Sequence, residues 1–150
     1  NIDVDGFRLN GNYSFQYCRN VVIRNAEIHS KDAFWNTEDV TVYDSVVDGE
    51  YLGWHSRNLR LVNCRISGTQ ALCYAENLVL ENCTLGEDAD LCFEYSSVHA
   101  EIKGRVHSVK NPRSGRIVAE EYGDIILDEH CKAPANCSIE TGKAQSGEAA

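Results

Sequence analysis

A repeat of 19 residues is the feature that most constrains the fold of this chain. Asn1, Asn20, Asp39, Asn58 and Asn77 each open a similar segment, and successive openers lie 19 residues apart without a gap. Apolar residues stand one and three positions after each opener, with a more polar residue between them in most copies. This alternation predicts a short strand with one buried face in every segment.

A second strand is expected after a sharp bend in each repeat. Five positions after the openers stand Gly6, Asn25, Asp44, Asn63 and Asn82, which are residue types that tolerate left-handed backbone angles. Two more apolar columns follow the bend. In stacked coils the bend residues would form a ladder of side-chain amides.

A third apolar segment closes each repeat after a polar turn. Three strands and three bends at a fixed period are typical of a β-solenoid. The sequence therefore predicts an all-β fold, a single-stranded right-handed parallel β-helix of triangular cross-section, with about 19 residues and three short strands per coil. The third segments read "SFQYC", "AFWNT", "LGWHS", "ALCYA" and "DLCFE".

Charged residues support this register. The position before each opener holds Arg19, Glu38, Arg57 and Glu76 in turn. Stacking would place opposite charges directly above one another, and a shift of one residue would lose the pattern. Because exposed ion pairs contribute only about 0.2–1 kcal/mol each, they indicate the alignment more than they stabilise it.

The repeat degrades toward the C-terminus. Val98, Ala100 and Ile102 come one place late, which indicates a one-residue insertion. The prediction is a solenoid over residues 1–130 and an irregular or mobile tail over residues 131–150. Within the solenoid we expect a loop at 110–115, a further coil through 115–119 that keeps the spacing of 19, and a closing strand at 124–128.

Several motifs resemble a bacterial family that is described only as a domain of unknown function. They include "KDAFW", "GEYLGW" and "FEYS", and the resemblance covers Gly11 to Asp128. It implies a right-handed parallel β-helix, like the pectin lyases in fold, of which this chain is the C-terminal half. It implies no catalytic residue. We expect missing N-terminal coils or a second chain to cover the Asn1 end, because an uncovered coil exposes sheet edges.

Charge and composition narrow the function classes. The net charge of −9 repels phosphate backbones, which argues against nucleic-acid binding. No apolar run approaches the roughly 20 residues of a membrane helix. The seven cysteines form no C-x-x-C pair, so we expect free thiols, including the stacked pairs Cys64 with Cys83 and Cys73 with Cys92, and a cytoplasmic location. No cofactor or metal is indicated.

The candidate site is a groove on the turn before the third strand and on that strand's outer side. Aromatic rings stack on sugar rings, and carboxylates supply the acid, base or nucleophile of glycoside cleavage. The candidate catalytic residues are Asp32, Glu50, Asp48, Lys31 and His55, and the candidate substrate-binding residues are Trp35, Trp54, Tyr51 and His29.

Two alternatives stay open. Either Phe15, Phe34, Leu72 and Leu91 point inward, or Trp35, Trp54, Cys73 and Cys92 do, in which case the indoles are core. His29 beside Asp48 and Lys31 beside Glu50 are also readily explained as a turn contact and a surface ion pair. The functional hypothesis is a protein that binds, and in its stronger form cleaves, a polysaccharide or oligosaccharide. The alternative is a non-catalytic structural or protein-interaction scaffold.

Overall fold

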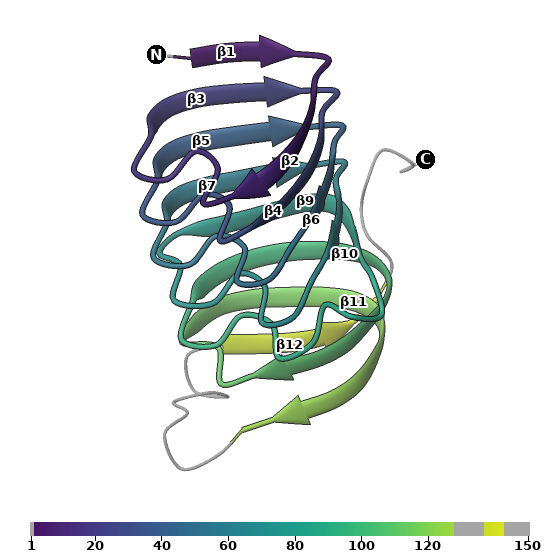
Figure 1. Cartoon of the computed structure of the whole chain (residues 1–150). Coiled ribbons are helices and arrows are strands. Elements are labelled where there is room, and N and C mark those ends of the chain that lie inside the picture. Colours follow the sequence, from purple (N-terminus) through teal and green to yellow (C-terminus); the bar gives the residue numbers. More distant parts are fainter. Residues whose placement is uncertain (1, 128–136, 143–150) are drawn as a thin grey trace.

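The chain folds into a β-solenoid. The computed structural model describes residues 2–127 and 137–142, and the strands of successive coils lie one above the other (Figure 1). All strand pairs between coils are parallel, and the described residues contain no helix. This confirms the predicted fold class.

The first face of the solenoid is a sheet of eight parallel strands. Inward residues such as Val21, Val40 and Leu59 stack in register, at the predicted spacing of 19. The strands are β1 (Ile2–Asp5), β3 (Arg19–Arg24), β5 (Glu38–Tyr43), β7 (Arg57–Val62), β9 (Leu78–Leu85), β10 (Ser97–Lys110), β11 (Ser114–Ile126) and β12 (Cys137–Thr141).

The second face begins after the bend. Its inward residues Ile28, Val47 and Ile66 are fully buried and pack against those of the first face in one core. β9 is long enough to belong to both faces, since Leu61 pairs with Leu80 and Ile66 pairs with Leu85. The other strands of this face are β2 (Arg8–Asn12), β4 (Glu27–Lys31), β6 (Val46–Asp48) and β8 (Arg65–Ser67).

The predicted bend and its amide ladder are confirmed. Asn25, Asp44, Asn63 and Asn82 have φ between 51° and 54°. The Asn63 side-chain amide donates to Asp44 at 3.1 Å, and the Asn82 amide donates to Asn63 at 2.7 Å. These bonds join coil to coil at the corner, where the backbone leaves the sheet.

A second amide ladder lies at the repeat openers, where none was predicted. Asn58 donates to Asp39 at 2.8 Å, and Asn77 donates to Asn58 at 2.7 Å. The openers are also left-handed, with φ of 57° at Asn20 and 59° at Asp39. Each coil therefore has two corners that are fixed by Asn or Asp side chains.

The third face differs from the predicted strand. Residues 13–18, 32–37, 51–56, 70–75 and 91–96 form turns, and every second residue in them is left-handed, as at Asp32, Phe34 and Asn36. Their N–H groups still bond between coils: that of Asp32 donates to Glu50 at 2.8 Å and that of Phe34 donates to Ser14 at 3.0 Å. The face is hydrogen-bonded like a sheet without being extended.

The C-terminal coils correct three predictions. The insertion is confirmed, because Val98 pairs with Leu78. However, Val98 pairs with Gly115, so the next coil has a spacing of 17 and not 19, and its loop is only Asn111–Arg113. Residues 124–126 are the end of β11 and not a separate closing strand.

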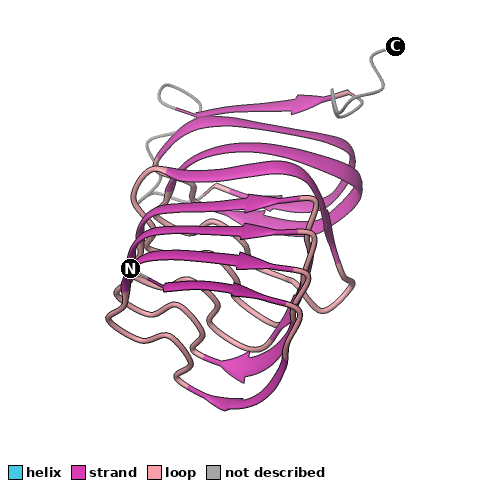
Figure 2. Ribbon diagram, turned by 90° about the horizontal axis from the view of Figure 1, so that it is seen from above, coloured by secondary structure: helices cyan, strands magenta, loops and turns pink. Residues whose placement is uncertain are grey.

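β12 corrects the predicted tail. Cys137–Thr141 pairs in parallel with β11, and Cys137 is buried. Regular structure therefore continues past residue 130. The rest of the predicted tail, residues 131–136 and 143–150, and residue 128 of the predicted closing strand lie outside the described residues. Figure 2 shows how the looped coils give way to long continuous strands toward this end of the solenoid.

Candidate functional site

Seven aromatic side chains form a continuous row on the third face. Neighbouring ring centroids lie 4.9–6.3 Å apart. The row crosses from coil to coil because the turn segments stack, and the left-handed residues turn alternate side chains away from the core. We call this row the aromatic stripe; it consists of Tyr13, Trp35, Tyr51, Trp54, His55, Tyr74 and Tyr95.

Both tryptophans lie on the stripe and are half-buried. Trp54 sits edge-on against Tyr51 at 5.0 Å and Tyr74 at 4.9 Å, and its indole N–H donates to the Gln70 carbonyl at 2.7 Å. Trp35 lies 6.3 Å from Tyr13. One edge of each indole packs on the protein while the remaining surface is open to solvent.

The question of which column points inward has a mixed answer. Phe34 and Leu72 are fully buried, as in the first alternative, and the two tryptophans are not. Cys73 and Cys92 are also fully buried, as in the second alternative. A strict in–out alternation fails here because the third face is made of turns, in which successive side chains do not point to opposite sides.

Asp32 and Glu50 are neighbours beside the stripe but differ in environment. Asp32 is only 3% exposed, and this burial raises the pKa of its carboxyl, with Lys31 opposing the shift and Glu50 adding to it. Glu50 is exposed. Lys31 holds its ammonium 5.9 Å from the centre of the Tyr51 ring, a cation–π contact. These four side chains share the rim of the stripe.

His29 and Asp48 lie on the second face and not on the stripe. His29 bridges two carboxylates, with Nε2 2.8 Å from Glu27 and Nδ1 3.2 Å from Asp48. The bonds to Glu27 and then Asp48 raise the pKa of His29, and the bond from Ser67 lowers the pKa of Asp48 most. The Ser67 hydroxyl donates to Asp48 at 2.8 Å and not to the imidazole, so the trio lacks the connectivity of a nucleophilic triad.

The nine candidate residues thus fall into two groups. The structure brings together Lys31, Asp32, Trp35, Glu50, Tyr51, Trp54 and His55 on or beside the stripe, and it separates His29 and Asp48 from them. Sequence reasoning missed Tyr13, Tyr74 and Tyr95. Tyr74 stands 19 residues after His55, so its column could have been recognised, whereas the insertion before Val98 hides the alignment of Tyr95.

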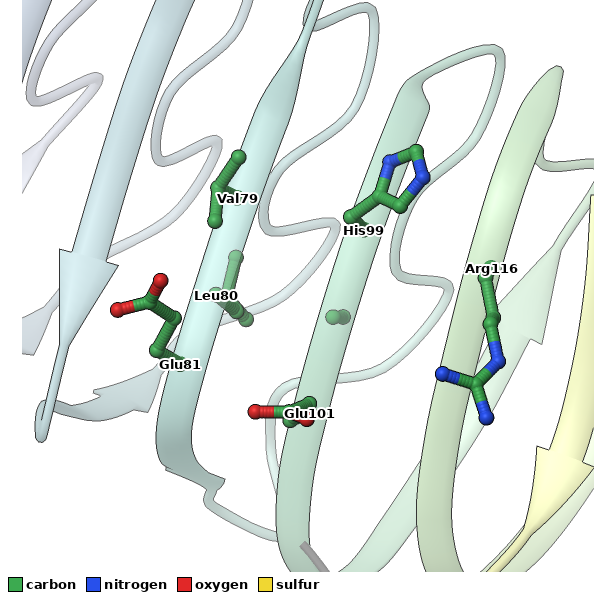
Figure 3. A pocket seen from close by; sticks show the side chains of 7 residues that line it. Val79, Leu80, Glu81, His99, Glu101 and Arg116 are labelled. Atoms are coloured by element: carbon green, nitrogen blue, oxygen red, sulfur yellow. The ribbon is translucent and has the colours of Figure 1, made fainter. Parts of the chain in front are cut away.

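A second candidate is a polar hollow on the outside of the first face. Figure 3 shows Glu81 on β9, His99 and Glu101 on β10, and Arg116 on β11 along its walls. Arg116 is already engaged, since its guanidinium donates twice to Glu140 at 2.9 Å. Glu81 likewise accepts from Arg60 at 2.8 Å. The hollow is therefore a surface lined by internal ion pairs.

Metal and membrane sites were sought over the same residues. Within 2–127 and 137–142, no group of three or more His, Cys, Asp or Glu side chains could hold a metal ion. No helix in these ranges is long and apolar enough to span a bilayer. The four stacked cysteines are free, as predicted, and burial raises the pKa of Cys73 to about 12.

The fold and this surface define a β-solenoid of parallel coils with an aromatic stripe on its turn side. The model of a family described as "Protein of unknown function (DUF3737)" matches residues 1–140, and the chain belongs to this family. No curated protein and no solved structure matches the sequence.

Proposed function

We propose that this solenoid binds a saccharide along the aromatic stripe. The observation that carries the proposal is the unbroken row of seven rings from Tyr13 to Tyr95, with centroids 4.9–6.3 Å apart. Such rings present apolar faces and edges to sugar rings, and polar groups at the rim fix orientation. Because the coils repeat, the stripe offers a series of similar contacts to a polymer of similar units.

The saccharide class follows from charge. The chain carries a net charge of −9, which disfavours an acidic polymer. Beside the stripe stand Lys31, Glu50 and the ion pair of Lys110 with Glu94, so the rim carries both signs and no cationic cluster. A neutral oligosaccharide is therefore the favoured ligand.

Calorimetric titration with neutral and acidic oligosaccharides tests binding. We expect a neutral sugar to bind and Trp54→Ala to weaken it at least tenfold. The control is Tyr43→Ala, an aromatic residue on the outside of the first face that lies away from the stripe. The proposal fails if no sugar binds, or if the two variants bind equally well.

Cleavage is the stronger form of the proposal and needs an acid and a base beside the stripe. Asp32 and Glu50 supply the two carboxyls, and the raised pKa of Asp32 suits a proton donor. Asp48 is disfavoured, because His29 and Ser67 occupy its oxygens. Glu50→Gln should abolish turnover of a bound sugar without lowering the melting temperature. Retained turnover would remove Glu50 from the site.

A non-catalytic scaffold is the second candidate. The observation that favours it is the degree to which stacked coils satisfy their own polar groups, as in the amide ladder through Asn63. Such a rod needs no ligand to be rigid. Failure of every sugar to bind would favour this function.

A further inference from the structure

Four exposed charges of alternating sign run along the corner where the third face meets the first. Arg19, Glu38, Arg57 and Glu76 lie one above the other in successive coils. Their side chains are between 37% and 75% exposed. We call these four residues the charge ladder.

The charge ladder is loosely paired within the chain. The Nε atom of Arg19 lies 3.6 Å from Glu38, and that of Arg57 lies 3.7 Å from Glu76. Charge-assisted bonds are usually about 2.7–2.9 Å long, and Arg60 reaches Glu81 at 2.8 Å on the same sheet. The ladder charges thus keep much of their capacity for other partners.

A column of exposed rings and amides runs parallel to the charge ladder. Tyr17 is 66% exposed and Tyr74 is 36% exposed, at the two ends of the column. Asn36 and His55 lie between them and are also exposed. A shallow hollow lined by Tyr17, Asn36, His55 and the first three ladder residues separates the two columns.

We propose that this corner is a self-association surface on which two copies of the chain pack antiparallel. A two-fold axis perpendicular to the solenoid axis places Arg19 opposite Glu76 of the second copy and Glu38 opposite Arg57. All four charges then meet opposite charges. The same operation places Tyr17 opposite Tyr74, so two aromatic contacts flank the ionic ones. The interface is isologous and closes at the dimer.

Other arrangements are disfavoured by the same pattern. A parallel pair without offset sets like charges opposite one another, which costs free energy at every rung. A parallel pair offset by one coil leaves rungs unmatched and does not close. The net charge of −9 on each copy opposes association at long range, but at physiological salt it is screened beyond about 8 Å. Aromatic burial supplies affinity, and the ladder supplies orientation.

Sedimentation velocity of the whole chain over a range of concentrations, at about 0.15 M salt, tests the proposal. We expect a monomer–dimer equilibrium. Glu38→Lys should raise the dissociation constant at least about tenfold, because symmetry makes the change count twice. Arg57→Glu should do the same.

The double variant Glu38→Lys with Arg57→Glu separates the dimer from an effect within the chain. It restores opposite charges across the two-fold axis but sets like charges next to one another within each ladder. We therefore expect it to recover dimerisation to within a few-fold of the original chain while its own ladder is worse paired. Arg60→Glu is the matched control, since it changes the same charge on the same sheet and lies outside the ladder.

Three results would overturn the proposal: a monomer at every concentration, a dimer that the single reversals leave unchanged, or a double variant that stays as weak as the singles. Melting temperatures of all variants check that each is folded. The proposal is independent of saccharide binding, although His55 and Tyr74 belong to both surfaces. A chain that dimerises and binds no sugar would therefore refute only the saccharide proposal.

Discussion

The N-terminal coils turn sharp corners, whereas the C-terminal coils pass the same position in continuous strands. Asn25, Asp44 and Asn63 hold the corner of the former in left-handed conformation and bond to neighbouring coils. β10 has no such residue there; it continues through Gly104, with a register shift between Ile102 and Arg105. Stacking of coils thus survives without the amide ladder, and the ladder's role is to sharpen the corner.

The third face shows the same contrast. The N-terminal coils carry six-residue turns, and their stacked side chains make the aromatic stripe. Between β10 and β11 only Asn111–Arg113 remains, and the stripe ends one coil earlier at Tyr95. The candidate site is therefore a property of the long-turn coils and not of the solenoid as a whole.

The largest expected effect is on the shared core. Leu61 is fully buried in the N-terminal coils, so Leu61→Ala should lower the free energy of unfolding by about 2–5 kcal/mol. Ile125→Ala, at a C-terminal position that is 43% exposed, should change it by no more than about 0.5 kcal/mol. Denaturant unfolding measures both. Equal losses would mean that the inward columns are wrongly assigned.

A corner substitution should have the next largest effect. Asn63→Ala places a β-carbon at φ 54° and removes the bonds to Asp44 and Asn82, for a loss of about 2–3 kcal/mol. Asn63→Gly keeps the conformation and should lose only the bonded part. The two variants would unfold alike if the left-handed corner contributed nothing.

The reverse substitution probes the C-terminal coils. Gly104 has φ 80°, and a β-carbon there would meet nothing within 4 Å. Gly104→Asn should therefore be tolerated within about 1 kcal/mol, whereas Gly104→Val should lose roughly 1–2 kcal/mol from backbone strain. Thermal unfolding of the pair checks this. A valine variant as stable as the asparagine variant would contradict the left-handed assignment.

The smallest expected effect is a pH dependence on the second face. The bonds to Glu27 and Asp48 raise the pKa of folded His29 above 6.5, so its contribution to stability is fully present below pH 6.5 and is lost as pH rises through the folded value. The melting temperature of the original chain should fall slightly over that window, relative to His29→Gln. Parallel profiles for the two proteins would rule out the bridge.

Much of the fold could be predicted because the period is written in side-chain chemistry. The columns through Val21, Val40 and Leu59 define the coils, and the Asn corners define the bends. The third face could not be predicted, because alternating apolar and polar residues look the same whether they form a strand or a turn of alternating hand. β12 was missed because only Cys137 and Ile139 mark it as apolar.

The site was predicted in part for a related reason. Trp35, Tyr51, Trp54 and His55 fall in columns that the repeat aligns, and the structure joins their rings. His29 and Asp48 share a repeat column but point from the second face, since the turn between the faces decides on which side they emerge. The burial of Asp32 depends on side chains from other coils, which no linear pattern records.

Tryptophan fluorescence during titration with neutral and acidic oligosaccharides tests the central claim most directly. Both tryptophans of the chain, Trp35 and Trp54, lie on the aromatic stripe. The account predicts a saturable change in emission with a neutral sugar, and loss of that change on Tyr74→Ala, which removes a ring in contact with Trp54. Emission that no sugar alters would contradict saccharide binding on the stripe.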